Sequence, residues 1–298
     1  MLKKIIIARN YGFCMGVKRA IKIAEETSAS ATERVTILNE IVHNEAVVER
    51  FRKEGLGQAL NLDDVTDGTL IISAHGVAPD IIEKAEAKGL NVINATCPLV
   101  TRIYDIIRRL VANDYYVIHF GDPNHDETRG VVGHAADRIT VVSSSPALDE
   151  LPAWPGRNLA LTTQTTSSMK EALEFRDLAL KKWPDLEVFD TICNATNRLQ
   201  SAVVDLAPHV DMILVVGSTT SANSKRLASI ANALCGRGIL IGSAVEIDER
   251  WFTGADGIRT VGISAGASTP EFLVEAVIKC LVDISGGTAE VVQQERIQ

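Results

Sequence analysis

Apolar residues occur along this chain in short continuous runs that alternate with amphipathic stretches. Runs such as Lys4–Ala8, Tyr115–Phe120 and Met212–Val216 end in polar turn residues, and apolar positions at helical spacing follow. Continuous runs are typical of strands that are covered on both faces of a sheet. The alternation of such strands with helices predicts an α/β fold built from parallel sheets.

One stretch in the first third of the chain combines these signals with a cysteine. Residues 90–93 predict a buried strand, and Cys97 follows after a small polar turn. Pro98 suits the first helical turn, where no N–H group is needed, and an apolar stripe then runs from residue 103 to residue 110. We therefore expect Cys97 at a helix N-terminus, a position that favours a thiolate.

The same unit occurs twice more in the chain. The strand Lys4–Ala8 leads to Cys14 and a helix, and the strand Leu186–Phe189 leads to Cys193 and a helix that ends near Leu206. The three cysteines lie at similar intervals, which indicates an internal repeat.

Each repeat continues with further strands that end in polar loops. The strand after each cysteine unit ends near His43, His125 or Ser221, and the last strand of each repeat ends near His75, Thr165 or Ser268. Functional loops of parallel sheets gather at the carboxyl ends of the strands. We therefore expect three pseudo-threefold-related α/β lobes around one shared centre: 1–95 with Cys14, 96–190 with Cys97 and 191–285 with Cys193, followed by a C-terminal tail, 286–298. The tail is expected to be polar or to contain a late strand over Ala289–Val292.

The composition narrows the classes of function. Of the 298 residues, 46% are hydrophobic and 23% charged, and the net charge of −8 argues against a nucleic-acid or anionic membrane surface. The apolar run near the N-terminus is too short for a signal peptide, and no run approaches a membrane span. Five widely spaced cysteines do not form a disulfide framework, so we expect a reduced, cytoplasmic compartment.

Three cysteines that converge from three lobes suit zinc or an iron–sulfur cluster. Structural zinc sites prefer four ligands, often in C-x₂-C pairs, and no such pair occurs here. Three cysteines on a four-iron cluster leave one iron free to act as a Lewis acid. A single buried cysteine also serves as a small apolar side chain, but three at equivalent repeat positions favour a ligand set. Cys235 and Cys280 lie in amphipathic helices, where we expect a core role.

Polar residues at the strand ends predict an anion pocket. His43, His75 and His125 occupy loop positions, whereas His119, His134 and His209 have no place in the repeat and are expected to be structural. Hydroxyl and amide groups complete the set, namely those of Thr165, Ser221, Asn223 and Ser268. No P-loop or dinucleotide-binding motif is present. Helix capping is the alternative role for each serine and asparagine.

Glu127 is the carboxylate two residues after His125 in one of these loops. In a dry centre its pKa would be raised and it would deliver protons. The alternative role is a first-turn glutamate that stabilises a helix dipole, and the spacing does not choose between the two.

Taken together, these motifs resemble the 4-hydroxy-3-methylbut-2-enyl diphosphate reductase (LytB/IspH) family, which acts last in the non-mevalonate isoprenoid pathway. The resemblance extends from Asn10 to about Leu281. Its landmarks are Gly12-Phe13-Cys14-Met15-Gly16-Val17, Glu40-Ile41-Val42-His43-Asn44, Ser73-Ala74-His75-Gly76-Val77, Ala95-Thr96-Cys97-Pro98-Leu99-Val100-Thr101, Thr163-Gln164-Thr165-Thr166, Ile192-Cys193-Asn194-Ala195-Thr196, Ser221-Ala222-Asn223-Ser224 and Ser264-Ala265-Gly266-Ala267-Ser268-Thr269-Pro270.

The resemblance implies one 4Fe-4S cluster per chain, held by Cys14, Cys97 and Cys193. It implies reductive removal of an allylic hydroxyl, with isopentenyl and dimethylallyl diphosphate as products and reduced ferredoxin or flavodoxin as electron donor. Glu127 would supply the proton, with Thr165 beside it holding the hydroxyl and His125 assisting. The diphosphate-binding set would be His43, His75, His125, Thr165, Ser221, Ala222, Asn223 and Ser268.

Three departures from the family pattern stand out. Asp126 takes the place of a proline between His125 and Glu127, which puts a second carboxylate near the proton source. Ala222 stands where the family often has a second serine, so a hydroxyl contact is lost and only a backbone N–H remains. Leu199 separates Arg198 from Gln200, whereas arginine and glutamine are adjacent in the family. The local contacts of this helix and the docking of the electron donor can therefore differ from those of the family.

Two other classes of function stay open at this stage. One is another three-cysteine cluster enzyme, similar to quinolinate synthase or a hydro-lyase, which would need an arginine-rich carboxylate site; Arg129 is the nearest arginine in these loops. The other is a non-catalytic iron–sulfur sensor or electron carrier, which would not need Glu127.

Overall fold

The structure is a computed structural model that describes residues 2–154, 156–253 and 257–295. The α-helices are α1 (Met15–Ser30), α2 (Glu45–Lys53), α3 (Pro79–Ala87), α4 (Pro98–Ala112), α5 (Asp126–Ala135), α6 (Met169–Lys182), α7 (Asn194–Leu206), α8 (Ala222–Cys235) and α9 (Glu271–Ile284). The strands are β1 (Lys4–Ile7), β2 (Val35–Leu38), β3 (Gly57–Ala59), β4 (Thr69–Ile72), β5 (Asn91–Asn94), β6 (Tyr115–Phe120), β7 (Ile139–Val142), β8 (Asn158–Thr163), β9 (Glu187–Val188), β10 (Met212–Val216), β11 (Gly238–Ile241), β12 (Thr260–Ala265) and β13 (Glu290–Gln293).

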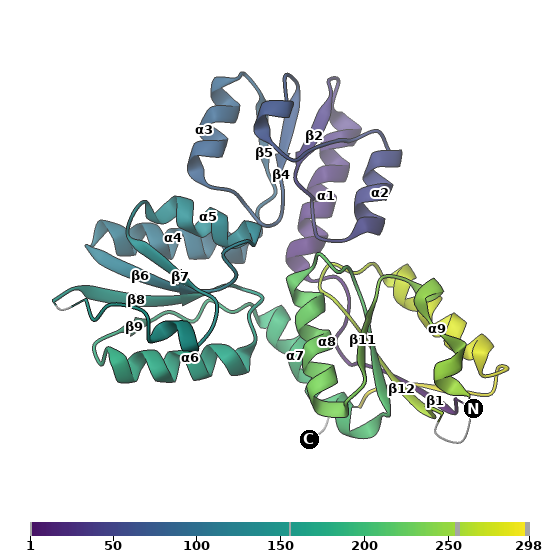
Figure 1. Cartoon of the computed structure of the whole chain (residues 1–298). Coiled ribbons are helices and arrows are strands. Elements are labelled where there is room, and N and C mark those ends of the chain that lie inside the picture. Colours follow the sequence, from purple (N-terminus) through teal and green to yellow (C-terminus); the bar gives the residue numbers. More distant parts are fainter. Residues whose placement is uncertain (1, 155, 254–256, 296–298) are drawn as a thin grey trace. The chain divides into compact units, whose positions relative to one another are not determined.

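The strands form three sheets, each flanked by helices (Figure 1), and every strand pairing is parallel. The first sheet has the order β3-β2-β4-β5, the second β7-β6-β8-β9, and the third β11-β10-β12-β1-β13. The expected α/β class with parallel sheets in three lobes is therefore confirmed.

The chain divides into two compact units. One comprises Met15–Val42 and Val48–Cys193, and it contains the first and second sheets. The other comprises Met1–Cys14, His43–Val47 and Asn194–Gln298, and it contains the third sheet.

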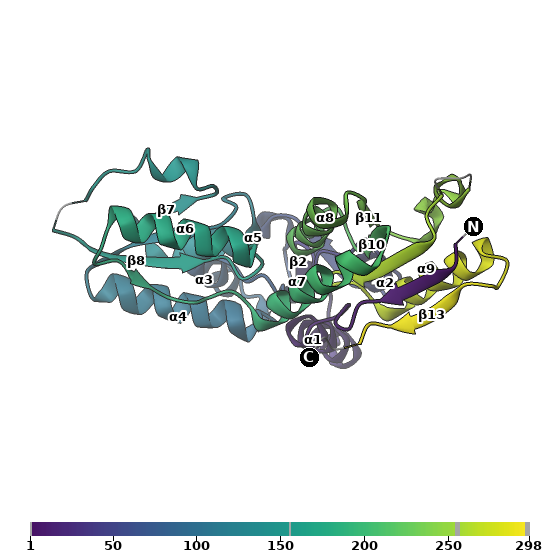
Figure 2. The same ribbon diagram turned by 90° about the horizontal axis from the view of Figure 1, so that it is seen from below.

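The second sheet is covered on both faces, as continuous apolar strands require. Ile118 and Leu161 face α6, where they pack with the fully buried Phe175. Val117 and Ala160 face the other way, against α4 and α5. Figure 2 shows β8 between α6 on one side and α4 on the other. In the first sheet, α3 covers one face through Ala85.

The third sheet has the same layered construction. Val215 and Ile213 pack with α7 and α8 on one face, and Leu214 and Ile263 pack with α9 on the other. The last stretch of the chain was expected to be a polar tail or a late strand over Ala289–Val292. The strand alternative is confirmed, because β13 pairs with β1 along its whole length.

Strand pairing corrects the expected grouping of the cysteines. The strand of residues 4–7 was expected in the first lobe, but β1 lies between β12 and β13 of the third sheet. The other two strands that precede a cysteine lie within the expected lobes: β5, before Cys97, pairs with β4, and β9, before Cys193, pairs with β8. Of these three strands, only β1 pairs elsewhere than its position in the repeat indicates, because pairing follows strand neighbours in space rather than sequence intervals. The lobe boundaries themselves stay a prediction.

The strand of residues 90–93 was also expected to be buried. It forms the edge strand β5, with Asn91 and Asn94 exposed at its ends. None of the helices within the described residues is long and apolar enough to cross a membrane.

Candidate functional site

Glu127 and Thr165 form a buried polar pair in the unit that holds the first two sheets. Glu127 lies in the first turn of α5, and Thr165 follows the carboxyl end of β8. The carboxylate accepts the Thr165 backbone N–H at 2.7 Å and the Thr165 hydroxyl at 2.5 Å. Glu127 is 2% exposed, and this burial raises its pKa, while the two bonds from Thr165 act in the opposite direction. The expectation of a raised pKa is confirmed.

His125 caps the helix that carries Glu127. Its Nδ1 accepts the backbone N–H of Glu127 at 3.1 Å, so the ring proton of the neutral histidine resides on Nε2. The ring of His75 meets the ring of His125 edge-on, with 5.7 Å between centroids. The structure thus brings together two of the histidines that the sequence placed at strand ends.

Tyr104 of α4 supports the loop that carries His75. Its hydroxyl donates to the backbone carbonyl of His75 at 3.2 Å. Gly76 has a φ of +73°, and a Cβ there would lie 2.3 Å from this hydroxyl; a Cβ at Gly130 would lie 2.2 Å from it. The two glycines therefore make the space in which the tyrosine reaches the loop. Burial raises the pKa of Tyr104 far above its usual range, so the phenol stays a neutral donor.

Cys97 is the N-cap residue of α4, and Pro98 begins the helix, as expected. The Cys97 N–H donates to Ala74 O at 3.0 Å, which ties the cysteine to the His75 loop. Burial raises the pKa of the thiol, and backbone N–H groups of Leu99 and Val100 oppose this shift. Burial therefore has a larger effect on the pKa of Cys97 than the N–H groups at the helix N-terminus.

Cys193 lies close to Cys97 in the same unit. The charges of Cys193 and Glu127 both act to raise the pKa of Cys97. The Cys193 N–H donates to Thr165 O at 3.1 Å, and the Thr191 hydroxyl accepts the N–H of Thr163 at 2.7 Å. The segment that carries Cys193 is thus attached to the end of β8, beside the Glu127–Thr165 pair.

The other unit holds the remaining predicted residues. The Cys14 N–H donates to Ala267 O at 3.0 Å, which places Cys14 in the loop region after β12. In the same region the Ser268 hydroxyl donates to His43 O at 2.9 Å. That all three thiols meet at one point stays a prediction.

Ser221, Ala222 and Asn223 begin α8. Ser221 is the N-cap residue and accepts the N–H of Ser224 at 3.3 Å, so the capping role holds for it. Asn223 is 4% exposed, and within the described part of the chain neither its Oδ1 nor its Nδ2 has a hydrogen-bond partner. A buried amide without a partner is costly, which favours a ligand-binding role for Asn223.

Among the residues expected to be structural, His119 and His134 pack against neighbouring side chains, Cys280 is half-buried and His209 is exposed. His119 is fully buried in β6 beside the Thr162 hydroxyl at 2.9 Å, and burial lowers its pKa to about 3. His134 stacks on Tyr104 with centroids 4.1 Å apart, and burial lowers its pKa to about 4. Cys235 packs at the edge of the third sheet's core.

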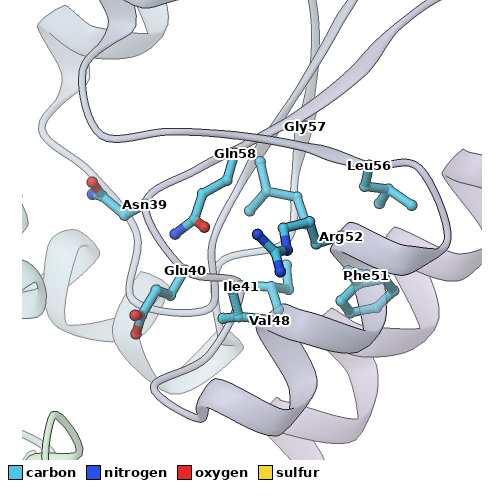
Figure 3. Close-up of a pocket in the computed structure, with 10 residues that line it drawn as sticks. Asn39, Glu40, Ile41, Val48, Phe51, Arg52, Leu56, Gly57 and Gln58 are labelled. Carbon is cyan, nitrogen blue, oxygen red and sulfur yellow. The ribbon is translucent and has the colours of Figure 1, made fainter.

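Two hollows lie away from the predicted residues. Figure 3 shows the smaller, a cavity of about 20 Å³ whose volume holds one water molecule and no substrate. It is lined by Ile37, Asn39, Glu40, Ile41, Val48, Phe51, Arg52, Leu56, Gly57 and Gln58. The larger, of about 440 Å³, lies at the amino ends of β6 and β8, beside Arg138 and Arg157. The functional loops occupy the opposite, carboxyl ends of these strands.

Sequence reasoning missed several supporting residues. Tyr104 falls within the apolar stripe of its helix, so its spacing carried only a packing signal. Gln164 accepts the N–H of Asp122 and donates to Thr166, which joins the loops after β6 and β8. Its position directly before Thr165, in the landmark Thr163-Gln164-Thr165-Thr166, was the sequence feature that could have indicated this supporting role.

Comparison with known proteins adds a family relationship. The family described as LytB protein matches residues 5–282 of the chain. The chain is 36% identical to the 4-hydroxy-3-methylbut-2-enyl diphosphate reductase of Pelobacter propionicus over 282 residues, which cover 95% of this chain and 99% of that protein. It is 37% identical to the reductase of the same name from Tolumonas auensis over 293 residues, which cover 96% and 94%.

Solved structures are similar over the same extent. The E-1-hydroxy-2-methyl-but-2-enyl-4-diphosphate reductase from Plasmodium falciparum matches with a TM-score of 0.93 at 29% identity, covering 100% of this chain and 94% of that one. A structure of (E)-4-hydroxy-3-methyl-but-2-enyl diphosphate reductase, the terminal enzyme of the non-mevalonate pathway, matches with a TM-score of 0.67 at 35% identity, covering 95% and 100%.

Proposed function

The chain belongs to the LytB protein family, and from this membership we propose that it reduces 4-hydroxy-3-methylbut-2-enyl diphosphate to isopentenyl and dimethylallyl diphosphate. The observation that carries the proposal within the site is the buried Glu127–Thr165 pair. A carboxyl group with a raised pKa, next to two cysteines, suits a reaction that consumes protons together with electrons.

The donor set fits a 4Fe-4S cluster. Cys97 and Cys193 are partly buried cysteines that form no disulfide within the described chain and that interact electrostatically, and thiolates are the ligands that such clusters use. Cys14, Cys97 and Cys193 would hold one cluster per chain. When bound, the cluster supplies electrons and an iron position without a protein thiolate, which polarises the substrate hydroxyl.

Glu127 is the proposed proton source. Its carboxyl group lies in a site that disfavours the charged form, so it holds a proton at higher pH than an exposed glutamate does. The Thr165 hydroxyl is in hydrogen-bond contact with it, which supports the proposed role of Thr165 in orienting the substrate hydroxyl. His125 keeps Glu127 in place through the helix cap and presents its Nε2–H.

The diphosphate is proposed to bind His43, His75, His125, Ser221, Asn223 and Ser268, with the backbone N–H of Ala222 in place of a hydroxyl. Histidine N–H, hydroxyl and amide groups donate hydrogen bonds to phosphate oxygens, and the N-terminus of α8 adds its dipole. The unpartnered amide of Asn223 supports this assignment.

The electron donor is proposed to be reduced ferredoxin or flavodoxin. We also propose a cytoplasmic location, because five cysteines without a disulfide among them in the described residues suit a reducing compartment and a thiolate-held cluster needs one.

Anaerobic purification tests the proposal. The expected result is a brown protein with about four irons per chain, as three-cysteine cubane ligation requires. It should oxidise a reduced viologen dye only when 4-hydroxy-3-methylbut-2-enyl diphosphate is added. A protein that incorporates a full cluster yet leaves this substrate unchanged would refute the reductase and favour an iron–sulfur sensor.

A further inference from the structure

The segment His43–Val47 belongs to the unit of the third sheet, although the residues on either side of it belong to the other unit. Two side-chain hydrogen bonds attach it there. The Ser268 hydroxyl donates to His43 O at 2.9 Å, and the Ser218 hydroxyl donates to the Glu45 carboxylate at 2.7 Å. The second bond joins the first turn of α2 to the loop after β10.

The Ser218 hydroxyl forms three hydrogen bonds. Ser218 is 2% exposed, it accepts the Thr220 N–H at 2.9 Å, and it lies 2.7 Å from the Thr220 hydroxyl. A hydroxyl group has one proton, and because a carboxylate only accepts, Ser218 donates that proton to Glu45. In the bond between the two hydroxyls, Thr220 must therefore be the donor and Ser218 the acceptor. Glu45 therefore fixes the direction of the hydrogen bond between the Ser218 and Thr220 hydroxyls.

The loop leads directly into the proposed diphosphate-binding residues. The Ser221 N–H donates to Ser218 O at 3.2 Å, and Ser221 in turn caps α8, whose second residue is Asn223. A continuous series of bonds thus runs from Glu45 through Ser218 to the N-terminus of α8.

We infer that Glu45 is a positioning residue that holds the Ser218–Ser221 loop in register with the His43 segment, so that the diphosphate-binding groups of both are set before substrate arrives. The inference rests on the proposed function, because it assigns a role to these groups. Glu45 does not bind the diphosphate itself, since two anions repel. It acts through the hydroxyl of Ser218.

A simpler role competes with this one. Glu45 is the acidic residue in the first turn of α2 and would stabilise that helix through its dipole wherever Ser218 lay. Replacement by glutamine separates the two roles, because glutamine loses the charge but keeps an oxygen that accepts from Ser218.

The test compares three variants of the cluster-loaded protein with a viologen dye as reductant. For Glu45→Ala we expect KM for the substrate to rise about tenfold, as loss of a charged hydrogen bond implies, with kcat within about twofold of wild type. The dissociation constant of inorganic pyrophosphate should rise by a similar factor. Glu45→Gln should restore both values to within about threefold, because the neutral bond remains.

Glu49→Ala is the matched control. Glu49 lies one turn further along α2 and pairs only with Arg52 and Lys53 among the ion pairs of the described chain, so its loss should leave KM unchanged. Ser218→Ala should match Glu45→Ala, and the double variant should be no worse than either, as expected for two partners of one bond.

Hydrogen exchange of residues 217–223 in the substrate-free protein gives a readout independent of turnover. It should be faster in Glu45→Ala than in Glu45→Gln or Glu49→Ala. If Glu45→Ala had the same KM and the same exchange rates as wild type, the inference would be overturned while the reductase function stayed intact. The same would hold if Glu45→Ala and Glu45→Gln raised KM by equal factors. A wild-type protein that neither turns over the substrate nor binds pyrophosphate would overturn the proposed function, and this inference with it.

Discussion

At the scale of single residues, the site depends on one carboxyl group whose surroundings oppose its charge. Glu127 is buried almost completely, and within the described chain its carboxylate accepts hydrogen bonds from a single residue, Thr165. Burial and hydrogen bonding therefore act on the pKa of Glu127 in opposite directions, and burial has the larger effect. This balance suits a group that must hold a proton and then release it.

Glu127→Gln should abolish proton delivery while preserving the site's shape. We expect kcat with a viologen dye to fall by about 10²- to 10⁴-fold, the usual contribution of a general acid. Iron content and the dissociation constant of the substrate should stay near wild type, as absorbance and calorimetry would establish. Unaltered turnover would remove Glu127 from the mechanism as the proton source.

Thr165→Val should move the pH dependence of turnover upward. The hydroxyl of Thr165 stabilises the charged form of Glu127, so its loss raises the pKa further. A proton donor works only while protonated, and activity is lost as pH rises through its pKa. The alkaline limb of kcat should therefore shift to higher pH by about one unit, the equivalent of one charged hydrogen bond. Thr165→Ser should keep the wild-type limb, and a shift to lower pH in the valine variant would contradict the assignment.

At the scale of elements, every predicted functional loop follows the carboxyl end of a parallel strand or begins a helix. Cys97 and Ser221 are N-cap residues, and His125 caps the helix that carries Glu127. Helix N-termini present unpaired N–H groups, so this arrangement supplies anion-binding donors from the backbone as well as from side chains.

The turn after β4 contains Gly76, and a substitution there tests how far contact with Tyr104 restricts this loop. Gly76→Ala should destabilise the protein by about 3 kcal/mol or more, because a positive φ and a close approach to Tyr104 add together. Gly89→Ala is the control, since its φ is +80° but nothing lies within 4 Å; it should cost only about 1 kcal/mol. Urea denaturation measures both, and equal costs would show that contact with Tyr104 is unimportant.

At the scale of the whole molecule, the chain repeats one layered design in three sheets, and it distributes the proposed cluster ligands among them. Cys14 follows a strand of the third sheet, Cys97 one of the first and Cys193 one of the second. If these cysteines hold the proposed cluster, the stability of the three sheets would depend on one cofactor, because metal binding contributes to folding free energy.

Cys97→Ser should therefore affect the entire protein. We expect the variant to lose the cluster, which iron analysis would show. Its thermal midpoint, measured by calorimetry, should be lower than that of the cluster-loaded wild type. Cys235→Ser is the control, because Cys235 contacts the carbonyl of Ala231 in its own helix and lies outside the proposed ligand set. Retention of four irons in Cys97→Ser would contradict the assignment.

Much of this architecture follows from sequence alone. Continuous apolar runs followed by helical stripes predict parallel α/β sheets, since only strands covered on both faces tolerate such runs. The same rule places His75, His125, Thr165 and Ser268 at strand ends without knowledge of any contact. Pro98 after Cys97 predicts the helix start, because proline at that position loses no hydrogen bond.

Tertiary structure decided the rest. Nothing local assigns β1 to the third sheet, because pairing between residues 4–7 and 260–263 depends on contacts far apart in the chain. Burial of Glu127 and the raised pKa of Cys97 likewise come from neighbours that the sequence does not put side by side. Periodicity records which face of an element avoids water, whereas partner choice and desolvation are properties of the packed molecule.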